Sequence, residues 1–137
     1  MAYQELAGLG NVICGSQLTE QDLKCLKSSL VIEEDENVLR LWAYCGWKKK
    51  KKSIDISDAL VGITDKAIFK FEKYKLTRIL LSTVNYASHN MLRIFEWDKL
   101  RLHLKNGTTE EVGIFHKSSC AHFVDFINRM VKMEMNK

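Results

Sequence analysis

The sequence predicts a mainly β, α+β fold: seven antiparallel strands in a partly open barrel, capped by a C-terminal helix and preceded by an N-terminal helix. Short β-prone apolar runs recur between polar breaks over residues 37–115. Residues 20–30 and 118–133 instead carry apolar residues at helical spacing. A seven-stranded sheet has two open edges and an apolar face, and bending it under a capping helix hides both.

The chain has 137 residues, a length that favours one domain with a sizeable core. Its first 16 residues contain three glycines and no clear apolar period. We therefore expect residues 1–18 to form an N-terminal arm and residues 19–137 to form the folded domain.

The N-terminal helix is expected over residues 20–30. Thr19 is a suitable N-cap, because its hydroxyl can accept a backbone N–H of the first turn. Acidic residues in that turn suit the positive end of the helix dipole. Its apolar face repeats at three- and four-residue spacing through Leu23, Leu26 and Leu30.

The clearest hairpin lies at the centre of the barrel. Two apolar runs flank a polar break, Thr64 to Ala67, in which Asp65 and Lys66 are poor strand formers. The seven strands are expected at 38–47, 53–63, 67–73, 76–86, 91–97, 99–105 and 108–115.

Two further turns are expected from composition. The polar run Ala87–Asn90 predicts a turn between the fourth and fifth strands. Asn106-Gly107 follows a cleanly alternating strand and favours a type I′ hairpin turn. After the last strand, Ser118 or Ser119 is expected to cap the C-terminal helix, residues 118–133.

Charge and cysteine content limit the class of protein. The net charge is +4, and the excess lies in one run of five lysines, Lys48 to Lys52. No apolar run is long enough to span a membrane, and residues 1–11 do not read as a signal peptide. We therefore expect a cytoplasmic protein whose four cysteines are free thiols.

Several motifs, taken in order, resemble the pleckstrin-homology-like (PH-like) superfold, in particular bacterial PH domains and GRAM domains. The resemblance covers about residues 30–131. Glu36 to Leu39 resembles the acid and paired aliphatics that open strand one in that family, and Gly62 to Phe69 resembles its central hairpin. Ile79 to Val84 resembles its fourth strand. Ala67 departs from the family pattern, which usually has arginine at that position.

The lysine run is the sharpest candidate binding feature. The resemblance implies that it occupies the loop between the first two barrel strands, where many PH domains meet inositol phosphates or anionic membranes. Trp47 could insert at a membrane interface beside it. A solvated loop that aids solubility is an equally good interpretation. The candidate ligand- or membrane-binding residues are Trp47, Lys48, Lys49, Lys50, Lys51 and Lys52.

Two other functions are less well supported. Lys99, Arg101, His103 and Lys105 line one strand face and could track phosphates, but outward positions of a strand are commonly polar. His116, Cys120 and His122 are close in sequence, and a Cys–His nucleophile can be imagined. We expect Cys120 to be buried, and we expect no catalytic site, metal site or cofactor.

The sequence thus favours a non-enzymatic binding or assembly module. Its partner would be another protein or a second copy, reached through a sheet edge, the groove beside the C-terminal helix, or the lysine loop. The alternative is peripheral binding to an anionic, phosphoinositide-type membrane through Lys48–Lys52. Nucleic-acid binding ranks third.

Overall fold

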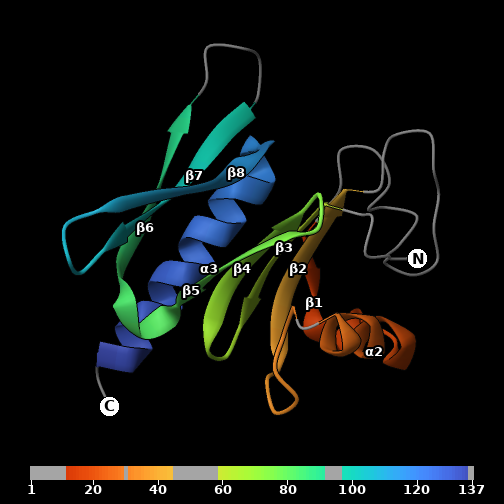
Figure 1. The fold of residues 1–137 in the computed structure, drawn as a ribbon. Coiled ribbons are helices and arrows are strands. Elements are labelled where there is room, and N and C mark those ends of the chain that lie inside the picture. Colours follow the sequence, from red (N-terminus) through yellow and green to blue (C-terminus); the bar gives the residue numbers. More distant parts are fainter. Residues whose placement is uncertain (1–11, 30, 45–58, 92–96, 136–137) are drawn as a thin grey trace. The chain divides into compact units, whose positions relative to one another are not determined.

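A computed structural model of the chain describes residues 12–29, 31–44, 59–91 and 97–135 (Figure 1). The chain divides into two compact units, residues 1–78 and residues 79–137. The described elements comprise two antiparallel sheets and two α-helices. This is the mainly β, α+β fold that the sequence predicts.

The first sheet has the strand order β1-β2-β3-β4-β5, and the second has the order β6-β7-β8. Strands β2, β3, β4, β7 and β8 overlap the strands expected at 38–47, 53–63, 67–73, 99–105 and 108–115, as far as these lie within the described residues, and β1 is an additional two-residue strand. The strand expected at 91–97 lies outside the described residues except for its ends: Met91 ends β6 and Trp97 begins β7. The first sheet and its helix consist of β1 (Ile13–Cys14), a 3-10 helix (Gly15–Gln17), α2 (Glu20–Ser28), β2 (Val38–Tyr44), β3 (Ala59–Thr64), β4 (Ala67–Glu72) and β5 (Lys75–Leu80). The remaining elements are a 3-10 turn (Leu81–Thr83), β6 (Val84–Met91), β7 (Trp97–Leu104), β8 (Thr109–His116) and α3 (Lys117–Met135).

Helix α2 begins as the sequence predicts. The Asp22 N–H donates to the Thr19 hydroxyl at 3.2 Å, and the Thr19 N–H donates to the Asp22 carboxylate at 2.9 Å. This reciprocal capping box satisfies two donors that the helix itself leaves unpaired. Leu26 projects from α2 into the core, which packs the helix against the first sheet.

The core of the first unit is built on β2, β3 and β4. Gly62 of β3 pairs directly with Phe69 of β4, whose side chain is fully buried. A Cβ atom added to Gly62 would lie 2.4 Å from the Phe69 ring, so glycine leaves the space that the ring occupies. The buried cluster comprises Leu18, Leu26, Val31, Ile32, Val38, Leu41, Leu60, Phe69 and Phe71.

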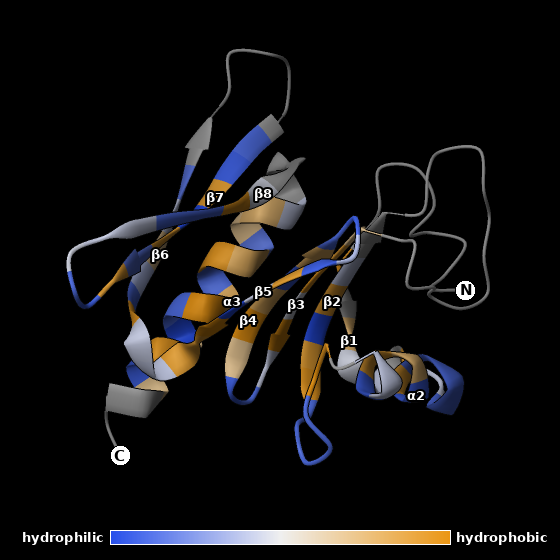
Figure 2. Ribbon diagram, in the orientation of Figure 1, coloured by the Kyte–Doolittle hydropathy of each residue, from blue (hydrophilic) through white to orange (hydrophobic). Residues whose placement is uncertain are grey.

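In the second unit, α3 packs against β6, β7 and β8. Figure 2 shows an apolar stripe along the helix. The stripe contains Phe123 and Ile127, which are fully buried. Asn128 also bonds the β6 backbone: its side-chain oxygen accepts the Ala87 N–H at 2.7 Å, and its side-chain nitrogen donates to the Ala87 carbonyl at 3.1 Å.

One expected strand is two elements in the structure. The segment expected as the fourth strand, 76–86, breaks at the 3-10 turn Leu81–Thr83, where β5 of the first sheet ends and β6 of the second sheet follows. The expected turn at Ala87–Asn90 is therefore wrong, because these residues lie within β6. Pairing with β7 and the bonds from Asn128 hold this polar segment extended.

The expected type I′ turn at Asn106-Gly107 is also wrong. Gly107 has a φ angle of 90°, but Asn106 is not among the described residues with positive φ, and type I′ requires both. The Gly107 N–H donates to the Leu104 carbonyl, and the Leu104 N–H donates to the Thr108 carbonyl. Residues 105–107 therefore lie between the hydrogen-bonded residues Leu104 and Thr108, in the pattern of a type I turn followed by a glycine bulge.

Helix α3 starts earlier than expected. It begins at Lys117, so Ser118 and Ser119 lie in its first turn and neither is the N-cap.

Replacing Gly62 by alanine tests the close approach to Phe69. We expect the variant to lose about 1–3 kcal/mol of unfolding free energy, because a rigid core ring must move. Gly107→Ala is the control: nothing lies within 4 Å of its added Cβ, and only the positive φ is strained, at about 1 kcal/mol. Urea unfolding measures both, and a Gly62→Ala variant as stable as wild type would contradict the packing.

Candidate functional site

The candidate residues Trp47 and Lys48–Lys52 lie outside the described residues, within segment 45–58. The structure does describe the strand residues on either side of that segment: Tyr44 of β2 pairs with Ala59 of β3. Because the sheet is antiparallel, these strand ends lie at the same end of the first sheet as the β4–β5 turn (Figure 1).

The β4–β5 turn presents an exposed aromatic side chain. Lys73 and Tyr74 have φ angles of 53° and 63°, the left-handed pair that a type I′ turn requires. Tyr74 is 71% exposed at the tip, and Lys75 follows it. The expected strands 67–73 and 76–86 leave a connection at 74–75, within one residue of this turn. Its left-handed geometry was not predictable, because neither lysine nor tyrosine favours positive φ. The only sequence signal is the two-residue spacing between the strands.

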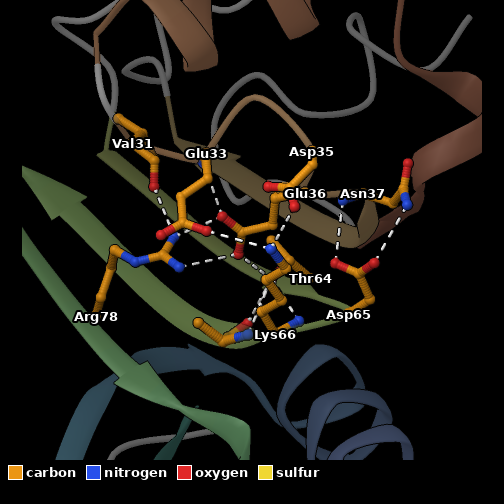
Figure 3. A network of polar contacts seen from close by, with 10 residues as sticks. Val31, Glu33, Asp35, Glu36, Asn37, Thr64, Asp65, Lys66 and Arg78 are labelled. Carbon is orange, nitrogen blue, oxygen red and sulfur yellow. Dashed lines mark hydrogen bonds and ion pairs between the residues drawn. The ribbon is translucent and has the colours of Figure 1, made fainter.

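At the opposite end of β4, a buried carboxylate organises a polar network (Figure 3). The side chain of Glu36 is fully buried. It accepts bonds from the Arg78 guanidinium at 2.8 and 3.1 Å, from the Glu33 N–H at 2.8 Å and from the Thr64 hydroxyl. Arg78 also donates to the Val31 carbonyl at 3.1 Å. The network thus joins β5, the β3–β4 turn and the segment before β2.

Two opposing effects act on the pKa of Glu36. Burial raises the pKa, while hydrogen bonds from Arg78, Thr64 and the Glu33 N–H lower it, and the net effect is a pKa below the ordinary value of 4.5. The carboxylate is therefore charged in the folded protein at neutral pH, with its donors already in place.

The β3–β4 turn is fixed to the same segment by a second set of contacts. The Asp65 carboxylate accepts the backbone and side-chain N–H groups of Asn37 at 3.1 and 3.2 Å. Lys66 contacts Asp35 at 2.8 Å and Glu33 at 3.3 Å. The hydrogen bond from Lys66 lowers the pKa of Asp35, and the same bond raises the pKa of Lys66.

The network explains two of the motifs that suggested the fold. Glu36 is the acid that opens the first motif, and Thr64 belongs to the second. The Thr64 hydroxyl accepts the N–H groups of Lys66 and Ala67 at 3.1 and 2.9 Å, which shapes the turn. Residues of the two motifs therefore hydrogen-bond to each other, since the Thr64 hydroxyl donates to the Glu36 carboxylate.

The basic face of β7 is contacted by neighbouring side chains, including one carboxylate shared by two of its cations. Glu111 of β8 contacts Arg101 at 3.2 Å and Lys99 at 3.7 Å. His103 stacks on Tyr86 with ring centroids 4.2 Å apart and bonds the Ser88 hydroxyl at 2.7 Å. This arrangement weighs against the face as a phosphate-tracking surface.

The environment of Cys120 does not suit nucleophilic catalysis. The residue is fully buried, and burial, with a smaller effect of the Asp98 charge, raises the pKa of its thiol to about 12. Asp98 bonds His89 at 3.1 Å, but its other carboxylate oxygen has no hydrogen-bond partner among the described residues. Within residues 12–29, 31–44, 59–91 and 97–135, no three His, Cys, Asp or Glu residues are placed to hold a metal ion.

Arg78→Ala tests the buried network. The change leaves the Glu36 carboxylate buried without its cation, and we expect a loss of about 3 kcal/mol of unfolding free energy at pH 7. Lys66→Ala is the control, because its ion pairs are exposed, and it should change stability little.

The pH dependence distinguishes this explanation from a packing loss. The folded pKa of Glu36 is depressed, so its contribution to wild-type stability is present above its unfolded pKa and is lost as the pH falls through the folded value. The difference between wild type and Arg78→Ala should therefore shrink in urea titrations taken from neutral towards acid pH. A difference that stays constant with pH would contradict the charge assignment.

Comparisons with known proteins bear on the fold. No protein-family model matches the chain, and no curated protein matches it. Among solved structures, the chain is similar to one described as the "Vps36 N-terminal PH domain", with 16% sequence identity and a TM-score of 0.53. The match covers 77% of this chain and 86% of that one. Among the described helices, none is long and apolar enough to cross a membrane. The similarity confirms the resemblance drawn from the motifs: the chain has a PH-like fold.

Proposed function

We propose that the chain forms a non-enzymatic binding or assembly module in the cytoplasm. Its partner is another protein or a second copy of the chain. The observation that carries this proposal is Tyr74, which a tight hairpin holds 71% exposed beside two lysines. Tyrosine is enriched among the residues that dominate binding energy at protein interfaces.

The second sheet offers poor sites for adding a strand. Asn128 already bonds both backbone groups of Ala87 on the outer side of β6. Strand β8 carries the exposed carboxylates Glu110 and Glu111, and charged edges discourage pairing. Of the three routes expected from the sequence, these features weigh against strand addition at the edges of the second sheet.

A second candidate function is peripheral binding to an anionic membrane through Trp47 and Lys48–Lys52. The specific support is that Tyr44 and Ala59, which flank segment 45–58, lie at the same end of the sheet as Lys73 and Lys75. Each lysine near an anionic leaflet contributes about 1 kcal/mol. Five lysines give at most about 5 kcal/mol, an affinity of about 0.2 mM, so a second anchor is required.

Changing Lys48–Lys52 to serine separates the routes to a protein partner. In a pull-down with matched wild-type protein, we expect a partner or a second copy to be retained by wild type. Retention by the variant would assign binding to a surface other than the lysine run, and loss would assign it to the run. Circular dichroism controls for folding. If wild type captures no protein and stays monomeric in light scattering at high concentration, the leading proposal fails.

Liposome flotation tests the second candidate. Wild type should float with vesicles that contain anionic lipid at low salt and be released as salt rises, because exposed charges are screened. The serine variant should stay in the bottom fraction with unbound protein at every salt concentration. Absence of wild-type binding at low salt would remove the membrane function.

A further inference from the structure

Strand β4 separates an acidic end of the first unit from a basic one. Lys66, just before the strand, contacts Glu33 and Asp35, whereas Lys73 and Tyr74 directly follow it. Six extended residues span roughly 17–20 Å. Figure 1 shows the β3–β4 and β4–β5 turns at opposite ends of the sheet, and Figure 2 shows both as hydrophilic. Within one copy, the two ends are too far apart to pair.

The acidic end keeps an excess of negative charge. Apart from the buried pair of Glu36 and Arg78, four exposed carboxylates gather there, and two lysines contact them: Lys66 as above and Lys27, which lies 3.9 Å from Glu34. Four negative charges less two positive charges leave two negative charges. The side chains of Glu34 and Asp35 are 90% and 76% exposed, so they are open to a partner. The four carboxylates belong to Glu33, Glu34, Asp35 and Asp65.

The basic end carries cations opposite in charge to these carboxylates. Among the described residues, no carboxylate lies within ion-pair distance of Lys73 or Lys75, and Glu72 is 3.8 Å from Lys70. Tyr74 lies between the two lysines in the sequence, and its exposed ring supplies apolar contact area together with a hydroxyl donor. A hollow beside the turn is lined by Lys70, Glu72, Lys73, Lys75 and Thr77.

The backbone of the turn does not require these side chains. A type I′ turn is best formed by Asn-Gly, whereas lysine and tyrosine are strained at positive φ. Strain of this kind is held in place by the surrounding structure and is found more often at ligand-contacting and switch positions than elsewhere.

We propose that the β4–β5 turn of one copy docks onto the acidic end, residues 33–35, of a second copy. Lys73 and Lys75 pair with its carboxylates, and Tyr74 packs between them. This inference rests on the assembly form of the proposed function. Because the two surfaces differ and lie at opposite ends of the sheet, the contact is head to tail and builds rings or open chains.

Sedimentation velocity over a range of protein concentration tests the contact. Wild type should associate at about 0.01 M salt, where the Debye length is about 30 Å, and dissociate at about 1 M salt, where it is about 3 Å. A monomer at every concentration at low salt would overturn the proposal. It would leave binding to a different protein untouched, since the pull-down tests that separately.

The double variant Lys73→Asn, Tyr74→Gly controls for folding. It installs the preferred type I′ pair, so its unfolding midpoint should equal or exceed that of wild type while its self-association weakens about tenfold or more. Self-association as strong as that of wild type would show that the turn plays only a structural part, and would overturn the proposal.

Charge reversal supplies the complementary test. Lys73→Glu with Lys75→Glu makes both ends acidic, and Glu34→Lys with Asp35→Lys makes both ends basic, while Glu33 stays in contact with Lys66. Each variant alone should be monomeric, and an equimolar mixture should associate. A mixture that stays monomeric overturns head-to-tail docking.

Vesicle flotation of the same turn variants tests the other use of the turn. If wild type is monomeric yet the turn variants lose flotation with anionic vesicles, the turn serves a membrane and the self-docking proposal fails.

Discussion

The bonding of the Glu36 carboxylate constrains the rest of the first unit. A buried charge is tolerated only when its lone pairs are met by donors, and here each oxygen accepts two bonds. The donors belong to Glu33, Thr64 and Arg78. Arg78 lies 42 positions after Glu36, so the carboxylate joins parts of the chain that are far apart in the sequence. Strands β3 and β5 must therefore present Thr64 and Arg78 to the same point, and the β3–β4 turn is placed as a consequence.

The placement of that turn determines where the charges lie. With Lys66 held against the acidic segment, the direction of β4 is set, and the next turn must emerge at the far end of the sheet. The unit thus separates its charges along a strand because of its hydrogen-bonded framework. A run of like charges in the sequence does not by itself produce this separation, because the separation depends on where the hydrogen-bonded framework places each turn.

Local sequence signals predicted elements whose determinants are local. The hairpin at residues 59–71 follows from two apolar runs around Asp65 and Lys66, and α2 follows from the Thr19 cap. The break between β5 and β6 was not predictable in this way. Residues 79–84 are continuously β-prone, and the sheet change depends on contacts made by residues far along the chain. Asn128, which holds Ala87 extended, is 41 residues away.

The two candidate binding surfaces differ in the same way: local sequence identifies one of them, and only the fold identifies the other. Composition alone identifies Lys48–Lys52, because five adjacent lysines need no structural context to stand out. Tyr74 was not predictable, because its exposure depends on a left-handed turn that its residue type disfavours.

The two candidate surfaces also differ in the side-chain entropy that binding costs. Lysine side chains lose conformational entropy when they pair, and exposed ion pairs contribute little to the free energy. A tyrosine has only two side-chain torsions and stands on a hairpin whose backbone is already ordered, so less freedom is lost when it meets a partner. On the proposed function, selectivity therefore depends on residues that the fold has already positioned, and the lysine run would add long-range attraction.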